Sequence, residues 1–138
     1  MKKLAYILSL VSCMFFGRVE AQQKMDGKIS FNQEVRTYSI YIPESYNDAF
    51  PNPMVFAIHP LDQSLSPRQF RDRLKKFAEK NGVILVCPEV AKGGNEKPFL
   101  EFMLQKSLEW MEVDINRIYS LNPSSMDLSE FPSIRGQV

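Results

Sequence analysis

The sequence predicts an α/β fold in which a mostly parallel sheet of about five strands is flanked by helices. Short apolar runs of strand-like composition alternate along the chain with two amphipathic segments of helical period. Such alternation favours right-handed crossover connections, which leave the connected strands parallel. The first two strands are separated only by a short polar turn, so we expect them to form an antiparallel hairpin at one edge of the sheet.

The first 21 residues have the features of a secretory signal peptide. Lys2 and Lys3 precede an uncharged apolar run over residues 4–16, and small residues lead to a cleavage point after Ala21. The apolar run is shorter than the roughly 20 residues of a membrane span. We therefore expect an exported protein. Anchoring as a lipoprotein through Cys13 is the alternative, because residues 10–13 are similar to a lipobox.

Three strands are expected at the start of the mature chain. Residues 27–31 and 36–42 flank a polar turn over residues 32–34, and the second run alternates apolar and polar side chains with a period of two. A proline-rich loop follows. Residues 54–58 are then continuously apolar, which is typical of a strand covered on both faces.

The first helix is predicted to begin at Pro67, with Ser66 as its N-cap, and to end at Asn81 and Gly82. Its apolar positions and its basic positions fall largely on opposite faces. We expect the apolar set, Phe70, Leu74, Phe77 and Ala78, to face the sheet and the basic set, Arg71, Arg73, Lys75, Lys76 and Lys80, to face solvent.

A second apolar strand is expected over residues 83–87, followed by a second helix over about residues 99–113. Cys87 lies inside that strand, so we interpret it as a buried thiol, and without the leader it has no partner for an intramolecular disulfide. The helix presents one apolar stripe toward the sheet, with Trp110 assigned to the core. The stripe comprises Leu100, Leu104, Leu108 and Met111 and is widened by Phe102, Met103 and Trp110.

The last strand is expected to begin at Arg117 and to end at Leu121. Asn122 and Pro123 then stop the strand, and Ser124 falls where a strand-to-helix turn would raise a serine hydroxyl above the sheet. Residues 127–138 are predicted to be a tail without clear structure. The strand of residues 117–121 would then be an unprotected sheet edge, which we expect to pair with a partner chain or a second copy.

The charge balance and the spacing of ligand-type residues argue against nucleic-acid binding and against a metal site. Removing the leader takes three basic and one acidic residue from totals of 17 and 16, which leaves a nearly neutral chain. This balance gives no electrostatic basis for nucleic-acid binding. No group of metal-ligating residues has the spacing of a metal site, so neither a metal nor another cofactor is predicted.

Four segments together resemble the secreted esterases related to polyhydroxybutyrate depolymerases and feruloyl esterases, within the α/β-hydrolase superfamily. They are residues 36–43 (RTYSIYIP), 53–59 (PMVFAIH), 81–88 (NGVILVCP) and 113–119 (VDINRIY). The resemblance implies a truncated α/β-hydrolase fold in which residues 22–126 are the amino-terminal half. It also implies a small ester as the substrate.

The resemblance assigns Ser124 to the place of the nucleophile. It implies an oxyanion hole formed by the backbone N–H of Ser125 and by one from the loop after His59, at Leu61 or Asp62. The sequence departs from the family pattern at three positions. Asn122 and Met126 replace the glycines of the Gly-x-Ser-x-Gly elbow, and Pro60 replaces a glycine in the oxyanion loop.

A base for the serine is missing. In this superfamily a histidine that follows the serine removes its proton, whereas the single histidine here, His59, precedes it. Asp127 and Glu130 lie beside the elbow and cannot take that role. We therefore expect an incomplete, inactive esterase, in which Ser124 and Ser125 are turn or capping serines. The alternatives are an esterase completed by another chain and a non-catalytic module that binds a polysaccharide or a cell-surface partner.

Overall fold

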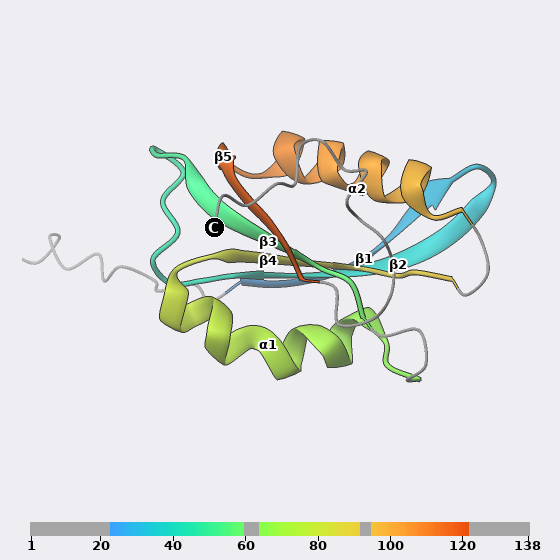
Figure 1. Ribbon diagram of the computed structural model, residues 1–138, viewed down its shortest axis with the longest axis horizontal. Helices are drawn as coiled ribbons and strands as arrows, with labels where there is room; N and C mark the ends of the chain where they lie inside the picture. Colours follow the sequence, from blue (N-terminus) through green and yellow to red (C-terminus); the bar gives the residue numbers. More distant parts are fainter. Residues whose placement is uncertain (1–22, 60–63, 92–94, 122–138) are drawn as a thin grey trace, which may run out of the picture.

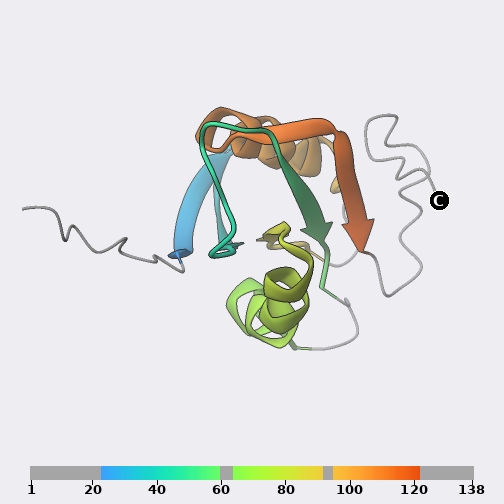
Figure 2. The ribbon, with the colours of Figure 1, turned by 90° about the vertical axis from the view of Figure 1, so that its left-hand side faces the viewer.

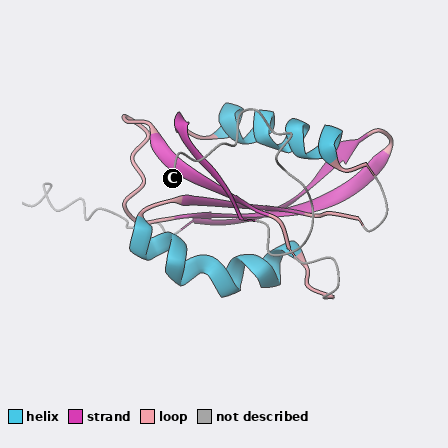
Figure 3. Cartoon of the chain, in the orientation of Figure 1, coloured by secondary structure: helices cyan, strands magenta, loops and turns pink. Residues whose placement is uncertain are grey.

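The computed structural model describes residues 23–59, 64–91 and 95–121, which form one sheet between two helices (Figures 1 and 3). In chain order the elements are β1 (Gln23–Phe31), β2 (Glu34–Ile42), β3 (Asn52–Ala57), α1 (Pro67–Asn81), β4 (Ile84–Pro88), α2 (Lys97–Trp110) and β5 (Val113–Leu121). Every predicted element is present. Several begin earlier than the apolar pattern indicated, and β1 starts four residues before Gly27.

The strands lie in the order β1-β2-β4-β3-β5. β2 is antiparallel to both β1 and β4, whereas β3 is parallel to β4 and β5. Four strands therefore run in one direction and only β2 opposes them, which confirms a mostly parallel sheet with an antiparallel first hairpin. The connection from β3 to β4 crosses the sheet in one direction, and the connection from β4 to β5 crosses it in the other. Because both crossovers are right-handed, their helices α1 and α2 lie on opposite faces of the sheet (Figure 2).

The hairpin turn is one residue shorter than the predicted turn. Asn32 and Gln33 both have positive φ, at 48° and 67°. Two central residues of this conformation match the right-handed twist of the flanking strands. The tight turn extends the β1–β2 ladder from Phe31 opposite Glu34 to Gln23 opposite Ile42.

Helix α1 has the predicted ends. The Ser66 hydroxyl accepts the Gln69 N–H, and the Gln69 side chain accepts the Ser66 N–H in return, which forms a capping box. Gly82 ends the helix in the left-handed conformation, with φ of 60°, where a Cβ would be strained.

Two residues of α1 do not lie where the amphipathic pattern placed them. Arg71 is only 1% exposed, although it was assigned to the solvent face, and Phe77 is 47% exposed, although it was assigned to the core. The buried residues Phe70, Arg71 and Ala78 define a stripe rotated away from Phe77. Arg71 can be buried because acidic and hydroxyl groups of the sheet surround its guanidinium.

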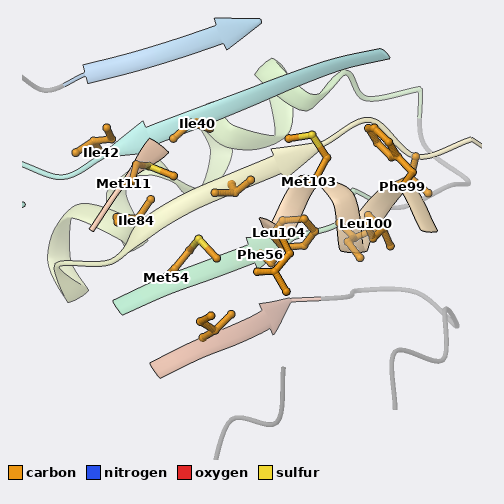
Figure 4. Close-up of a cluster of buried hydrophobic side chains, with 14 residues drawn as sticks. Ile40, Ile42, Met54, Phe56, Ile84, Phe99, Leu100, Met103, Leu104 and Met111 are labelled. Carbon is orange, nitrogen blue, oxygen red and sulfur yellow. The ribbon is translucent and has the colours of Figure 1, made fainter. Parts of the chain in front are cut away.

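The sheet has an apolar core on each face, because β3 and β4 are buried on both sides, as their continuous apolar runs predicted. Figure 4 shows the larger core, under α2. It contains Ile40, Ile42, Met54, Phe56, Ile58, Ile84, Val86, Val90, Phe99, Leu100, Met103, Leu104, Met111 and Ile118. The core under α1 contains Tyr41, Val55, Ala57, Phe70, Ala78, Val83, Leu85 and Cys87.

The C-terminal turn of α2 differs from the prediction. Trp110 is 40% exposed and Leu108 is 37% exposed, so the assignment of Trp110 to the core was wrong. Ser107 occupies the buried stripe instead, because its hydroxyl donates to the Met103 carbonyl at 2.7 Å. Trp110 packs at the margin of the sheet against Tyr38, with ring centroids 5.3 Å apart.

Raising the pH is expected to destabilise the fold through Tyr41. This side chain is 2% exposed, and its hydroxyl donates to Glu79 Oε2 at 2.6 Å. Burial, together with the Glu79 carboxylate, raises the pKa of Tyr41 from 10.0 to about 12. Between those values the unfolded chain loses this proton and the folded chain keeps it, so stability falls as pH rises.

The Tyr41 contribution is fully present below pH 10 and is lost by about pH 12, with an upper limit of roughly 3 kcal/mol. Urea unfolding from pH 9 to pH 12 measures it, with Tyr41→Phe as the comparison. The variant loses the Glu79 hydrogen bond at every pH, and its stability should decline less steeply. Equal slopes for the two proteins would show that Tyr41 is not the group responsible.

Candidate active site

The carboxyl ends of parallel strands are where α/β folds place ligands, and here β3, β4 and β5 end at the same edge. The predicted nucleophile Ser124 and the predicted oxyanion donors Leu61, Asp62 and Ser125 lie outside the described residues. The structure therefore describes the strand ends that lead to the predicted site residues, and not those residues themselves. The three departures from the family pattern and the two tail carboxylates also lie outside them: Pro60, Asn122, Met126, Asp127 and Glu130.

The two chain segments that carry the predicted site leave the sheet side by side. Ala57 at the end of β3 is opposite Leu121 at the end of β5. The Ile58 N–H donates to the Leu121 carbonyl at 2.9 Å, which joins the strands at their last described residues. The segment with the predicted oxyanion donors and the segment with Ser124 thus start from adjacent, hydrogen-bonded positions.

His59 lies just beyond the carboxyl end of β3, and it is 7% exposed. Its Nε2 accepts a hydrogen bond from the Val90 N–H at 3.3 Å. A neutral imidazole has one acceptor nitrogen and one N–H. Because Nε2 is the acceptor toward Val90, Nδ1 carries the hydrogen, and this tautomer has no second lone pair for a serine proton. His59 therefore links the ends of β3 and β4.

Carboxylates near this edge also have structural partners. Glu89 Oε2 accepts the Thr37 N–H at 2.6 Å and the Thr37 hydroxyl at 2.8 Å. Glu96 is 3% exposed, pairs with Arg36 and accepts the Ala91 N–H at 3.3 Å. These bonds hold the segment after β4 against β2. The one signal for them in the sequence is Arg36, the single charged residue of the strand predicted over residues 36–42.

A second buried polar cluster joins α1 to the hairpin. Arg71 Nη1 donates to Ser39 Oγ at 2.8 Å and pairs with Asp26, while Nη2 donates to Asp72 Oδ1 at 3.0 Å. The Ser39 hydroxyl also donates to Asp26. This cluster is not visible in the sequence, because nothing in the helical pattern shows that polar groups of β1 and β2 face this turn of α1.

Cys87, the free cysteine among the described residues, is unsuited to catalysis. It is fully buried, and burial raises the pKa of its thiol, so the reactive thiolate does not form near neutral pH. Within residues 23–59, 64–91 and 95–121, no cluster of three metal-ligating side chains is present. None of the helices in those ranges is sufficiently long and apolar to span a membrane.

No protein-family model matches the chain, and no curated protein matches it either. Several solved structures share its fold. They include the fluorophosphonate-binding serine hydrolase FphF of Staphylococcus aureus (TM-score 0.59, 9% identity), an arylesterase (0.57, 13%) and a ferulic acid esterase (0.55, 13%). Each similarity covers 71% of this chain but only 46%, 34% and 49%, respectively, of the matched structure. The chain thus spans between a third and a half of the length of these structures.

Proposed function

Because the chain has an α/β-hydrolase fold, we propose that it is an exported relative of carboxylic-ester hydrolases that does not hydrolyse esters by itself. One observation carries the proposal. The only histidine of the sequence, His59, uses Nε2 to accept the Val90 N–H. The leader of residues 1–21 supports export.

The chemical reason is the weakness of an unassisted hydroxyl. A serine becomes a nucleophile for a small ester when a positioned base removes its proton. Loss of the histidine from a serine triad lowers kcat by about 10⁶-fold. The nearby carboxylates Glu89 and Glu96 accept hydrogen bonds within the scaffold, so they support the loop rather than a reaction.

Ester hydrolysis by the purified chain tests the proposal. We expect short-chain aryl esters to be cleaved no faster than in buffer, and we expect Ser124→Ala to give the same rate as the parent chain. Ser125→Ala is the matched control, because it removes the neighbouring hydroxyl. Turnover that Ser124→Ala abolishes and Ser125→Ala retains would overturn the proposal.

An esterase completed by another chain is the second candidate. It is favoured by β5, which has β3 as its single neighbour among the described residues and so leaves an edge open. That candidate requires turnover to appear when a partner chain containing a histidine is added. The proposed function requires none from the chain alone at any protein concentration.

A further inference from the structure

We propose that the outer edge of β1 pairs with β1 of a second copy of this chain, antiparallel about a two-fold axis at Gly27. The sheets of the two copies then form one continuous sheet across a symmetric dimer. This inference concerns assembly and goes beyond the proposed function. It is independent of whether any ester is cleaved.

The outer edge of β1 is long and regular. Among the described residues, β1 has β2 as its single neighbour. All nine of its residues, Gln23 to Phe31, pair with β2 without a register shift, and none of them is proline. No bulge therefore turns this edge away from a further strand.

One hydrogen bond determines which backbone groups lie on the outer edge. The Thr37 carbonyl of β2 accepts the Glu89 N–H at 3.0 Å, so it faces the side of β4. Backbone groups of successive strand residues face alternate sides, so those of Tyr38 face β1. Gly27 is opposite Tyr38, and its groups face β2 in return. The residues of β1 whose N–H and C=O groups face outward are therefore Lys24, Asp26, Lys28 and Ser30.

An axis at Gly27 makes this edge complementary to itself. It places Asp26 of each copy opposite Lys28 of the other, so that outward-facing groups meet outward-facing groups. It also places Met25 opposite Ile29, and both of these residues pack against the core under α2. Opposite charges and apolar side chains are favourable cross-strand pairs. All nine residues of each strand take part, which favours a second copy as the occupant of the edge.

Charge disfavours the neighbouring registers. An axis at Asp26 would place the two Asp26 carboxylates opposite each other and Lys24 opposite Lys28. An axis at Lys28 would place its two ammonium groups opposite each other. Like charges directly opposite destabilise a strand pair. The lysines of this edge, which would otherwise discourage association, therefore select one register.

The Asp26 carboxylate is available to a second copy. Its Oδ1 accepts hydrogen bonds from Ser39 and Arg71, which places the side chain on the α1 face of the sheet. Its Oδ2 lies 3.7 Å from Arg68 Nε, beyond hydrogen-bond distance. The Asp26 side chain is 43% exposed, and Lys28 is exposed on the same face. Lys28 of the second copy can therefore reach Oδ2.

The opposite face of the edge carries an aromatic contact at the axis. A Cβ atom at Gly27 would collide with the Cζ and hydroxyl of Tyr38, so the tip of that ring lies over Gly27. Tyr38 packs in turn against Trp110, which is 40% exposed. An axis at Gly27 brings the Tyr38 rings of the two copies together, where β1 itself has no side chain. Aromatic pairs of this kind add stability beyond the area that they bury.

Analytical ultracentrifugation of the purified chain tests the assembly. We expect a dimer at about 100 µM that dissociates on dilution, as is typical of small interfaces. Lys28→Glu places a carboxylate opposite Asp26 in both pairs and should raise the dissociation constant at least about tenfold. Lys76→Glu is the matched control, because it makes the same change of charge at an exposed position of α1 and should leave the constant unchanged.

Hydrogen exchange measured by NMR locates the interface. The amides of Asp26 and Lys28 face outward, so we expect them to exchange at least about tenfold more slowly in the dimer than in the diluted chain. The Gly27 amide faces β2 and should be protected at both concentrations. The Val86 amide, in central β4, reports whether each variant is folded.

Several outcomes would overturn the inference. A chain that stays monomeric at the higher concentration is one, and a dimer that Lys28→Glu weakens no more than Lys76→Glu is another. Protection of the Asp26 and Lys28 amides that does not change with concentration would mean that a segment of the same chain covers the edge. A dimer in which these two amides exchange fast would mean that the copies meet elsewhere.

Discussion

Replacing Phe56 by alanine is expected to lower the free energy of unfolding by about 3–5 kcal/mol. Phe56 lies in the middle of the sheet on β3 and is completely buried. Its ring belongs to the core under α2, among Met54, Leu100 and Leu104 (Figure 4). Truncation removes most of its apolar surface and leaves a cavity that the close-packed strands on either side cannot fill.

Small domains have a free energy of unfolding of about 5–15 kcal/mol, so this substitution would remove a large fraction of the total stability. Urea unfolding followed by circular dichroism measures the change. Phe50→Ala is the matched control, because Phe50 is 65% exposed and should change stability by less than about 0.5 kcal/mol. A loss below about 1 kcal/mol for Phe56→Ala would mean that the sheet does not pack against α2 as described.

Replacing Arg71 by alanine is expected to cost about 3 kcal/mol, within the range for breaking a buried ion pair. Among the described residues it is the largest fully buried side chain, and its guanidinium bonds Asp26, Ser39 and Asp72. Its removal leaves a cavity, and the buried Ser39 hydroxyl loses the guanidinium that donates a hydrogen bond to it. Because Asp26 remains 43% exposed, water can solvate its carboxylate, which keeps the loss from being larger.

Arg73→Ala provides the comparison on the same helix, because Arg73 is exposed and should change stability by less than about 0.5 kcal/mol. Thermal and urea unfolding of the two variants give the difference directly. Equal stabilities would contradict the burial of Arg71. Asp26→Asn should lower stability by less than Arg71→Ala, since it removes one partner and leaves the guanidinium bonded to Ser39 and Asp72.

Much of the fold follows from local patterns. The continuous apolar runs before His59 and at Cys87 predicted central strands, and Ser66 and Gly82 predicted the two ends of α1. Each of these signals depends on backbone preferences or on a repeat within one element. The placement of the helices on opposite faces then follows from the handedness of the crossovers.

The errors concern contacts between elements. The pattern of α1 contains both Arg71 and Phe77, and only the positions of Asp26 and Ser39 on the sheet determine which of the two is buried. Trp110 likewise lies at the margin of the sheet because Ser107 can occupy the buried stripe by bonding its own helix. No periodicity within a single helix contains this information.

The candidate site was predictable in one respect. A single histidine that precedes the serine is visible in the sequence, whereas the bond between its Nε2 and the Val90 N–H is not. The roles of Glu89 and Glu96 also depend on contacts between β2 and the segment after β4. The predictions for Ser124, Ser125, Leu61 and Asp62 remain predictions.

Labelling by a fluorophosphonate probe tests the central claim most directly, because the reagent modifies serines whose hydroxyl is activated by a base. With an intact serine hydrolase as positive control, we expect the folded chain to show no label that depends on Ser124. Label on the folded chain that disappears both on heating and in Ser124→Ala would contradict the claim, because it would demonstrate a base that acts on this serine.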